Sequence, residues 1–443
     1  MINKKGGGKA MFTQNKEVLG NFKKFGAKFS SYDDGKKLTV QINSKSYKYT
    51  FDKLKNYYLQ KKIITVSSTL NIHMFDYHIV SFYYLNENSF EIYYDYRIEK
   101  FSGNKCYSII INSKDIDVFS QNSSFLNNFI SGLKNKNFDI SKDDHEVSFE
   151  INHSKYKLSL FNSIFAPGFM ECNVSFKSFL TISSEKELDF LELIRLFNYI
   201  KTLIAFCTHR KNIDFDYVEL FDKHNPKLAD FEIPFGEMYV PYFDHVHTFK
   251  NYNDNPMIRI DSLVNVIGNL FDAIDKSVFD TTYIPNETDS FNSNFVNSTA
   301  WLQCFFRVWA AHNPRFKVKK INVEDTQIKN KSGNNSIVSF QSMIDFLMDY
   351  CKDYMTNAFD DLIVIFKFFN NMDTFNKKFS ERIKSMRNDF CHGHVDYKNK
   401  NYKHCKIDLK VLDMCIYASI LKYVGIDKDS CNKALNQLFN NSN

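Results

Sequence analysis

The spacing of apolar residues changes once along this chain, and the change limits the folds that the chain can adopt. From about residue 36 to residue 182, apolar residues recur with a period close to two, which is typical of strands. From about residue 184 onward, most apolar stretches have the period of an amphipathic helix. We therefore expect an α+β protein in which a β-rich N-terminal part precedes a helical C-terminal part.

The N-terminal part, residues 1–280, is expected to form a sandwich- or barrel-like body with packed helices. Short apolar runs and polar turns predict hairpins there. These join Leu38–Ile42 to Tyr47–Phe51, Ile79–Leu85 to Phe90–Tyr96, and Val147–Ile151 to Tyr156–Leu160. Ser184 and Glu187 match a capping box, in which the Ser oxygen accepts from the N–H three residues on, so we expect a long helix to start there.

The C-terminal part is expected to be an all-α bundle. Residues 281–294 are polar and form the predicted linker, and residues 295–443 form the predicted bundle. Its predicted helices are Val296–Ala311, Phe340–Met355, Ala358–Phe369, a helix through Phe375, Phe379, Ile383, Met386 and Phe390, Leu409–Val424, and Cys431–Phe439. The Lys-rich and polar segment 314–335 is expected to be a mobile loop.

The composition fits a folded cytoplasmic protein. Hydrophobic residues make up 44% of the chain, which is ample for a core, and the net charge of +6 does not by itself indicate an anionic partner. Nine cysteines stand singly, which is unlike a disulfide framework and indicates a reducing compartment. The sequence contains no run of about 18 apolar residues, so we expect no membrane contact.

One short motif carries the functional information. The segment Ser385–Gly393 reads SMRNDFCHG and places Arg387 and His392 at the end of an amphipathic helix. Residues five apart on a regular helix point about 140° apart. The two side chains therefore meet only if the helix ends there or if the site is composite.

The pattern R-N-x-x-x-H-G resembles the signature of HEPN domains, small helical bundles that commonly act as metal-independent ribonucleases. A β-rich body followed by a linker and such a bundle is similar to the ApeA-type anti-phage proteins, whose HEPN domain is thought to cut tRNA on infection. The resemblance implies a homodimer through the bundle, RNA such as tRNA as substrate, a phage-derived trigger, and no metal or cofactor. The chain departs from many relatives at Thr299–Gln303, which lacks their acidic residue.

The residue types in the motif suit RNA cleavage by the 2′-hydroxyl. His392 is the predicted acid/base, because His titrates near neutral pH. Arg387 is the predicted phosphate clamp, since its guanidinium donates two parallel hydrogen bonds to phosphate oxygens. Asn388 is expected to orient the Arg or the His, and Asp389 to fix the imidazole tautomer. The products would carry 2′,3′-cyclic phosphate and 5′-hydroxyl ends.

Basic and aromatic residues follow the motif and are the predicted RNA contacts, namely Tyr397, Lys398, Lys400 and Lys403. A second basic cluster surrounds Phe316. Either cluster could instead be a solvated face. Cys391, His392, His394, His404 and Cys405 lie close in sequence, but adjacent His404 and Cys405 rarely both reach one metal, so we do not predict a zinc site.

Other interpretations of the motif remain open. Taken alone, R-x4-H also describes a surface Arg paired with an acidic residue beside a His that caps a helix. A non-catalytic HEPN-type module would bind RNA or a partner protein and regulate another process. A third class is a bundle that binds a nucleotide or a metal.

Overall fold

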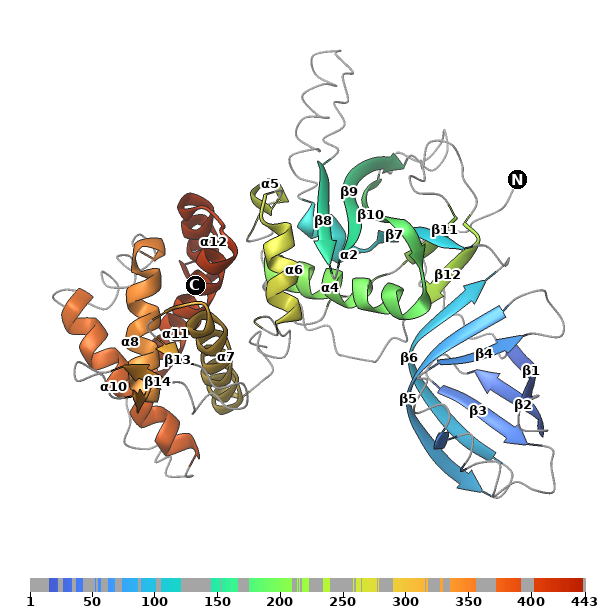
Figure 1. Cartoon of the computed structure of the whole chain (residues 1–443), viewed down its shortest axis with the longest axis horizontal. Helices are drawn as coiled ribbons and strands as arrows, with labels where there is room; N and C mark the ends of the chain where they lie inside the picture. Colours follow the sequence, from blue (N-terminus) through green and yellow to red (C-terminus); the bar gives the residue numbers. More distant parts are fainter. Residues whose placement is uncertain are drawn as a thin grey trace, which may run out of the picture. The chain divides into compact units, whose positions relative to one another are not determined.

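The computed structural model in Figure 1 has strands in its N-terminal half and helices in its C-terminal half, which confirms the α+β class. The residues that it describes are 16–22, 27–33, 37–42, 52, 55–56, 63–67, 74–86, 89–100, 105–120, 145–151, 153–165, 175–208, 213, 215, 217–222, 234–239, 258, 260–263, 265–276, 278, 290–314, 316–317, 327–329, 335–355, 372–391 and 402–440. The chain divides into two compact units. One comprises residues 1–112, 181–195 and 215–252, and the other residues 113–180, 196–214 and 253–443.

The first unit is built on an antiparallel sheet. Its strands are β1 (Lys16–Phe22), β2 (Ala27–Asp33), β3 (Lys37–Ile42), β4 (Ile63–Ser67), β5 (Met74–Asn86), β6 (Ser89–Lys100), β7 (Cys106–Asn112), β11 (Tyr217–Phe221) and β12 (Gly236–Tyr239). Their order is β1-β2-β3-β6-β12-β11-β7, and β5 pairs with both β4 and β6. Alternate residues of β6 are buried, as the period of two predicts.

A charged cluster is buried in this sheet. Asp33 accepts hydrogen bonds from the hydroxyls of Tyr77 and Tyr94 at 3.0 and 2.7 Å and from the guanidinium of Arg97 at 2.6 Å. The Arg97 guanidinium also lies 4.6 Å from the ring centroid of Tyr239. Because these partners lie in the same sheet as Asp33, we assign this cluster a structural role.

Two of the predicted hairpins are confirmed. Asn86 pairs with Ser89 at the turn between β5 and β6, and Ile151 pairs with Ser154 at the turn between β8 (His145–Ile151) and β9 (Ser154–Phe165) of the second unit. The prediction that Leu38–Ile42 pairs with residues 47–51 remains a prediction, because residues 43–50 lie outside the described ones. Leu38–Ile42 itself lies in β3, which pairs with β2 and β6.

The helix predicted to start at Ser184 begins at Phe190 instead. Strand β10 (Ser175–Leu188) continues through the predicted cap, because residues 178–184 are buried in the sheet. Helix α4 (Phe190–Thr208) follows a different capping box. The Glu192 N–H donates to Asp189 Oδ1 at 2.9 Å, and the Asp189 N–H donates to Glu192 Oε2 at 3.1 Å.

The second unit contains the C-terminal helices. Its helices after α4 are α5 (Ile260–Leu263), α6 (Ile267–Asp275), α7 (Phe291–Ala311), α8 (Phe340–Cys351), the 3-10 helix η5 (Lys352–Tyr354), α10 (Met372–Cys391), α11 (Tyr402–Val424) and α12 (Lys428–Asn440); helix α2 (Lys114–Phe119) lies earlier in the chain. Helix α11 packs against α7, α8, α10 and α12. None of the described helices is long and apolar enough to cross a membrane.

The predicted linker and bundle boundary differ from the observed packing. Helix α7 starts at Phe291, where the Ser293 N–H donates to the capping Ser290 Oγ at 3.1 Å, so the end of the predicted linker is helical. The Trp301 indole N–H donates to the Val278 carbonyl at 2.8 Å. Residues on both sides of the predicted linker therefore belong to one unit. The predicted helix at residues 358–369 lies outside the described residues.

The segment predicted to be a mobile loop contains a small antiparallel sheet. Its strands are β13 (Phe316–Lys317), β14 (Gln327–Lys329) and β15 (Asn335–Ile337). Phe316 is buried against the rings of Phe306, Trp309 and Phe346, with centroids 5.5, 5.5 and 5.1 Å away. The loop prediction was wrong there because strands of two or three residues show no period.

Candidate functional site

Helix α10 carries the first half of the motif. It extends to Cys391, so Arg387, Asn388 and Asp389 lie in its last two turns, and His392 follows its last residue. The side chains of His392, Tyr397, Lys398, Lys400 and Lys403 lie outside the described residues, although Lys403 is in the first turn of α11. The predicted meeting of Arg387 with His392 therefore stays a prediction.

The apolar face predicted for α10 is buried as far as the structure describes it, and the side chain of Phe375 lies outside the described residues. Phe379 and Ile383 are fully buried and Met386 is buried, while the half-buried Phe390 packs against α7. Its ring centroid lies 5.0 Å from that of Phe295 and 5.7 Å from that of Phe291. These contacts hold the last turn of α10, and with it the motif, against α7.

Arg387 lies on the flank of this face. It is half-buried, and its guanidinium carbon lies 4.6 Å from the ring centroid of Phe340, which is a cation–π geometry. Within the part of the chain that the structure describes, Arg387 forms no ion pair. Those residues therefore do not contain the acidic partner that a purely structural surface arginine would have.

A second arginine on α10 has the opposite environment. Arg382 donates from Nε and from a terminal nitrogen to the two carboxylate oxygens of Asp408 on α11, each at 2.7 Å. Asp408 is buried. This bidentate pair fixes α10 against α11, one and a half turns before Arg387.

The start of α8 contributes to the electrostatics near Arg387. Phe340 is the first residue of α8, and the Ser342 N–H donates to the Ser339 Oγ at 3.1 Å as an N-terminal cap. A helix N-terminus carries partial positive charge and orients N–H groups outward. Arg387 and this helix end therefore present positive potential in the same place, which favours an anion such as a phosphate.

The structure also reveals a carboxyl group that the sequence analysis missed. The Ser298 hydroxyl of α7 donates to Asp413 Oδ1 of α11 at 2.5 Å. Burial raises the pKa of Asp413 to about 7, although the hydrogen bond from Ser298 opposes this shift. Ser298 lies one turn after Phe295, the residue that packs against Phe390. The bundle thus contains a carboxyl group able to exchange a proton near neutral pH, one helical turn from the contact that holds the motif.

The signal that could have identified Asp413 is its place in an apolar helix. All residues from Val411 to Leu421 are buried except Asp413, which is half-buried. An acidic residue within such a run has to find a hydrogen-bond partner or take up a proton. The sequence does not identify Ser298 as that partner.

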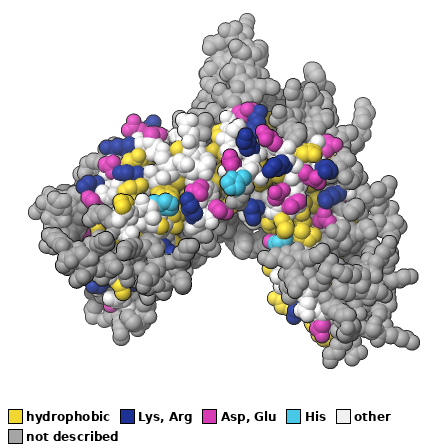
Figure 2. All heavy atoms as spheres, in the orientation of Figure 1, with side chains coloured by type: hydrophobic (Ala, Val, Ile, Leu, Met, Phe, Trp, Pro, Cys, Tyr) yellow, Lys and Arg dark blue, Asp and Glu magenta, His cyan; other side chains and the backbone are white. Residues whose placement is uncertain are grey.

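The cysteine and histidine cluster gives no metal site in the described residues. No group of three or more His, Cys, Asp or Glu side chains lies close enough there to hold a metal ion. Cys405 is half-buried, while the side chains of Cys391, His392, His394 and His404 lie outside the described residues. On the face drawn in Figure 2, basic and acidic side chains of the described residues are interspersed.

Comparisons of the chain with family models, with curated proteins and with solved structures found no match. No relative therefore supplies a function for this chain. The function has to be argued from Arg387, the end of α10 and the elements that pack around it.

Proposed function

We propose that this chain is a metal-independent endoribonuclease of the HEPN type, with Arg387 and His392 as its catalytic residues. The observation that carries the proposal is the environment of Arg387. It lies at the end of α10, close before His392 in sequence, stacks on Phe340 and forms no ion pair with any described residue. Its N–H donors are thus not used by a described carboxylate, in contrast to those of Arg382.

The proposed reaction uses the 2′-hydroxyl of RNA as nucleophile. His392 accepts the proton of that hydroxyl or donates one to the leaving 5′ oxygen. A bond forms between the 2′ oxygen and phosphorus while the bond from phosphorus to the 5′ oxygen breaks, which leaves 2′,3′-cyclic phosphate and 5′-hydroxyl ends. Arg387 and the N-terminus of α8 stabilise the charge that develops on the phosphate. Asn388 and Asp389 orient the catalytic pair.

The biological setting belongs to the same proposal. The resemblance to ApeA-type proteins suggests an abortive-infection effector in the bacterial cytoplasm, with tRNA or other single-stranded RNA loops as substrate. The bundle would pair as a homodimer so that both motifs line one cleft. The β-rich part would be a sandwich- or barrel-like sensor for a phage-derived trigger. Tyr397, Lys398, Lys400 and Lys403 would contact the RNA.

The test is digestion of total tRNA by the purified full-length chain in EDTA. We expect Arg387→Ala and His392→Ala each to abolish cleavage, while both variants keep the circular dichroism spectrum of the folded wild type. Lys384→Ala is the matched control, because Lys384 is exposed on the same helix. Undiminished cleavage by both motif variants would contradict the proposal.

Two other outcomes point to the alternative functions. If the chain binds RNA without cutting it, it is a non-catalytic HEPN-type module that regulates through RNA or protein binding. If EDTA stops the cleavage, the reaction depends on a metal ion, and the role given to Arg387 and His392 fails.

A further inference from the structure

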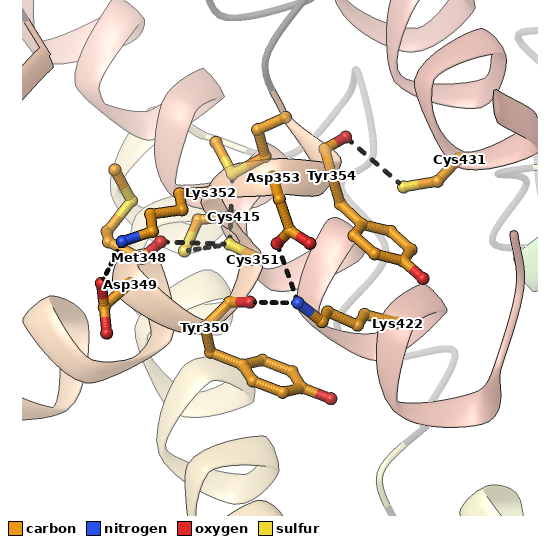
Figure 3. Close-up of polar contacts among 11 residues, drawn as sticks. Met348, Asp349, Tyr350, Cys351, Lys352, Asp353, Tyr354, Cys415, Lys422 and Cys431 are labelled. Carbon is orange, nitrogen blue, oxygen red and sulfur yellow. Dashed lines mark hydrogen bonds and ion pairs between the residues drawn. The ribbon is translucent and has the colours of Figure 1, made fainter. Parts of the chain in front are cut away.

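Two buried cysteine sulfurs meet where α8 ends against α11 (Figure 3), and a methionine sulfur contacts one of them. Cys351 Sγ lies 3.6 Å from Cys415 Sγ and 3.2 Å from Met355 Sδ. All three residues have 0% of their surface exposed to solvent. Cys351 is the last residue of α8, Met355 follows η5, and Cys415 lies in the middle of α11.

These three atoms form a soft set of potential metal ligands. Thiolates and thioethers select soft metal ions such as Cu(I) over the hard cations that prefer oxygen. At a metal–sulfur distance of about 2.3 Å, three sulfurs in a trigonal plane lie about 4 Å apart. The observed separations of 3.2 and 3.6 Å would therefore have to widen by about 0.8 and about 0.4 Å to admit an ion.

We propose that Cys351, Cys415 and Met355 form a binding site for a monovalent soft metal ion, of which Cu(I) is the biological representative. The site is separate from Arg387 and does not depend on the proposed ribonuclease activity. On binding, each thiol would lose its proton, and the two thiolates and the neutral thioether would each donate an electron pair to the metal ion. No electron is transferred.

A buried hydroxyl lies beside the cluster. Ser419 is fully buried and lies one turn after Cys415 on α11, and its hydroxyl is within hydrogen-bonding reach of the Cys415 thiol. A metal-bound thiolate accepts a hydrogen bond better than a neutral thiol does, so a bound ion would strengthen this contact.

A positive charge also lies near the site. Figure 3 shows Lys422, whose Nζ donates to the carbonyl of Tyr350, the residue before Cys351, and to Asp353 Oδ1, both at 2.8 Å. Because α8 changes there into the short 3-10 helix η5, we expect an ion to enter through local opening at this end of the helix.

A disulfide between Cys351 and Cys415 accounts for fewer of these contacts. A disulfide would leave the contact of Met355 Sδ with Cys351 Sγ unexplained.

The experiment is a Cu(I) titration of the full-length chain under anaerobic conditions, with a phosphine reductant and a chromogenic Cu(I) chelator as competitor. We expect the wild type to withhold one copper ion per chain, and Cys351→Ala and Cys415→Ala to withhold none. Met355→Leu keeps the side-chain volume and should weaken binding at least about tenfold, since even outer-shell partners change metal affinity 10–100-fold. Cys207→Ala is the control, because Cys207 is a fully buried thiol with no sulfur partner among the described residues.

Three results would overturn the site. The first is a wild type that withholds no copper from the competitor. The second is equal retention by the wild type and by Cys351→Ala or Cys415→Ala, which would show adventitious binding elsewhere. The third is an unchanged Cu(I) affinity of Met355→Leu. This variant decides the question if the two cysteine variants do not fold.

Discussion

Arg382 and Arg387 lie on the same helix, yet their surroundings give them different roles. Arg382 is saturated by two hydrogen bonds to the buried Asp408, so it holds α10 in place. Arg387 rests on the ring of Phe340 and forms no ion pair with a described residue. When a guanidinium stacks on an aromatic ring, its N–H groups point outward in its own plane. They can therefore still donate hydrogen bonds to a phosphate ligand.

The ring beneath Arg387 is therefore expected to support cleavage. Phe340→Leu keeps an apolar side chain but removes the cation–π contact, which is worth about 0.5–2 kcal/mol, so we expect cleavage of tRNA to fall by roughly 2- to 30-fold. Phe346→Leu is the control, since Phe346 lies on the same helix but packs against Phe306 and Phe316. Equal cleavage rates for Phe340→Leu and the control would show that the ring does not position Arg387.

Asp413 is expected to make stability depend on pH. Burial raises its pKa to about 7 in the folded chain, so the folded state binds the proton more tightly than the unfolded state does. The free energy of unfolding should therefore fall as the pH rises from about 4 to about 7, and should stay low above that. We expect the free energy of unfolding of Asp413→Asn, which keeps the acceptor for Ser298, to exceed that of the wild type by about 4 kcal/mol at pH 8 and to differ little at pH 4. Urea unfolding at both pH values measures the difference.

The pKa of Asp353 is shifted in the opposite direction to that of Asp413, so its effect on stability should depend on pH in the opposite way. Burial acts to raise its pKa, but the hydrogen bond and charge of Lys422 lower it overall. Its contribution to stability is present above the pKa of the unfolded carboxyl and is lost as the pH falls through the folded pKa. Asp353→Asn should thus be less stable than the wild type at pH 8. A stabilising effect there, or no effect of Asp413→Asn, would show that these carboxyl environments are misassigned.

At the scale of the elements, the Arg382–Asp408 pair is expected to anchor α10 to α11. Arg382→Ala leaves the Asp408 carboxylate buried without its partner, which typically costs about 3 kcal/mol of unfolding free energy. Lys352→Ala breaks an exposed pair with Asp349 instead, and should cost less than about 0.5 kcal/mol. Chemical denaturation measures the free energy of unfolding of both variants. Equal losses in the two variants would mean that the Arg382–Asp408 pair does not anchor the helix.

Long periodic elements could be predicted from the sequence, while short or overridden elements could not. The β5–β6 and β8–β9 hairpins and helices α7, α8, α11 and α12 follow from apolar spacing over many residues. The predicted helix start at Ser184 was wrong because burial in the sheet overrides the capping pattern there, and the helix follows the capping box of Asp189 and Glu192 instead. Asp413 and the Cys351–Cys415 contact were missed because they pair residues far apart in sequence.

At the scale of the whole molecule, the C-terminal helices share their core with earlier segments. The Tyr417 hydroxyl donates to the Phe206 carbonyl at 2.8 Å, and the Asn269 side-chain amide donates to the Val424 carbonyl at 2.9 Å. Tyr417 is almost fully buried. Removal of the segment that contains Phe206 would therefore expose its aromatic ring and leave its hydroxyl without this acceptor. The sequence could not show this, because the second unit is assembled from three separate stretches of chain.

The predicted bundle is therefore not expected to fold fully by itself. A fragment that starts at residue 281 lacks Phe206, Asn269 and Val278. Backbone or side-chain groups of these three residues form hydrogen bonds with the C-terminal helices. We expect it to unfold at a lower urea concentration than the full chain, with a shallower transition. Circular dichroism during denaturation provides the measurement. A transition of the fragment that matches the full chain in midpoint and slope would make the bundle an independent domain.

Metal-independent cleavage by the 2′-hydroxyl is tested most directly by the chemical ends of the RNA products. Total tRNA is digested with the full-length chain in EDTA, and the new termini are identified by enzymatic end-labelling and mass spectrometry. If Arg387 and His392 act as proposed, the fragments carry 2′,3′-cyclic phosphate and 5′-hydroxyl ends, and neither Arg387→Ala nor His392→Ala produces them. Fragments with 3′-hydroxyl and 5′-phosphate ends, or the same fragments from both variants, would contradict the proposed site.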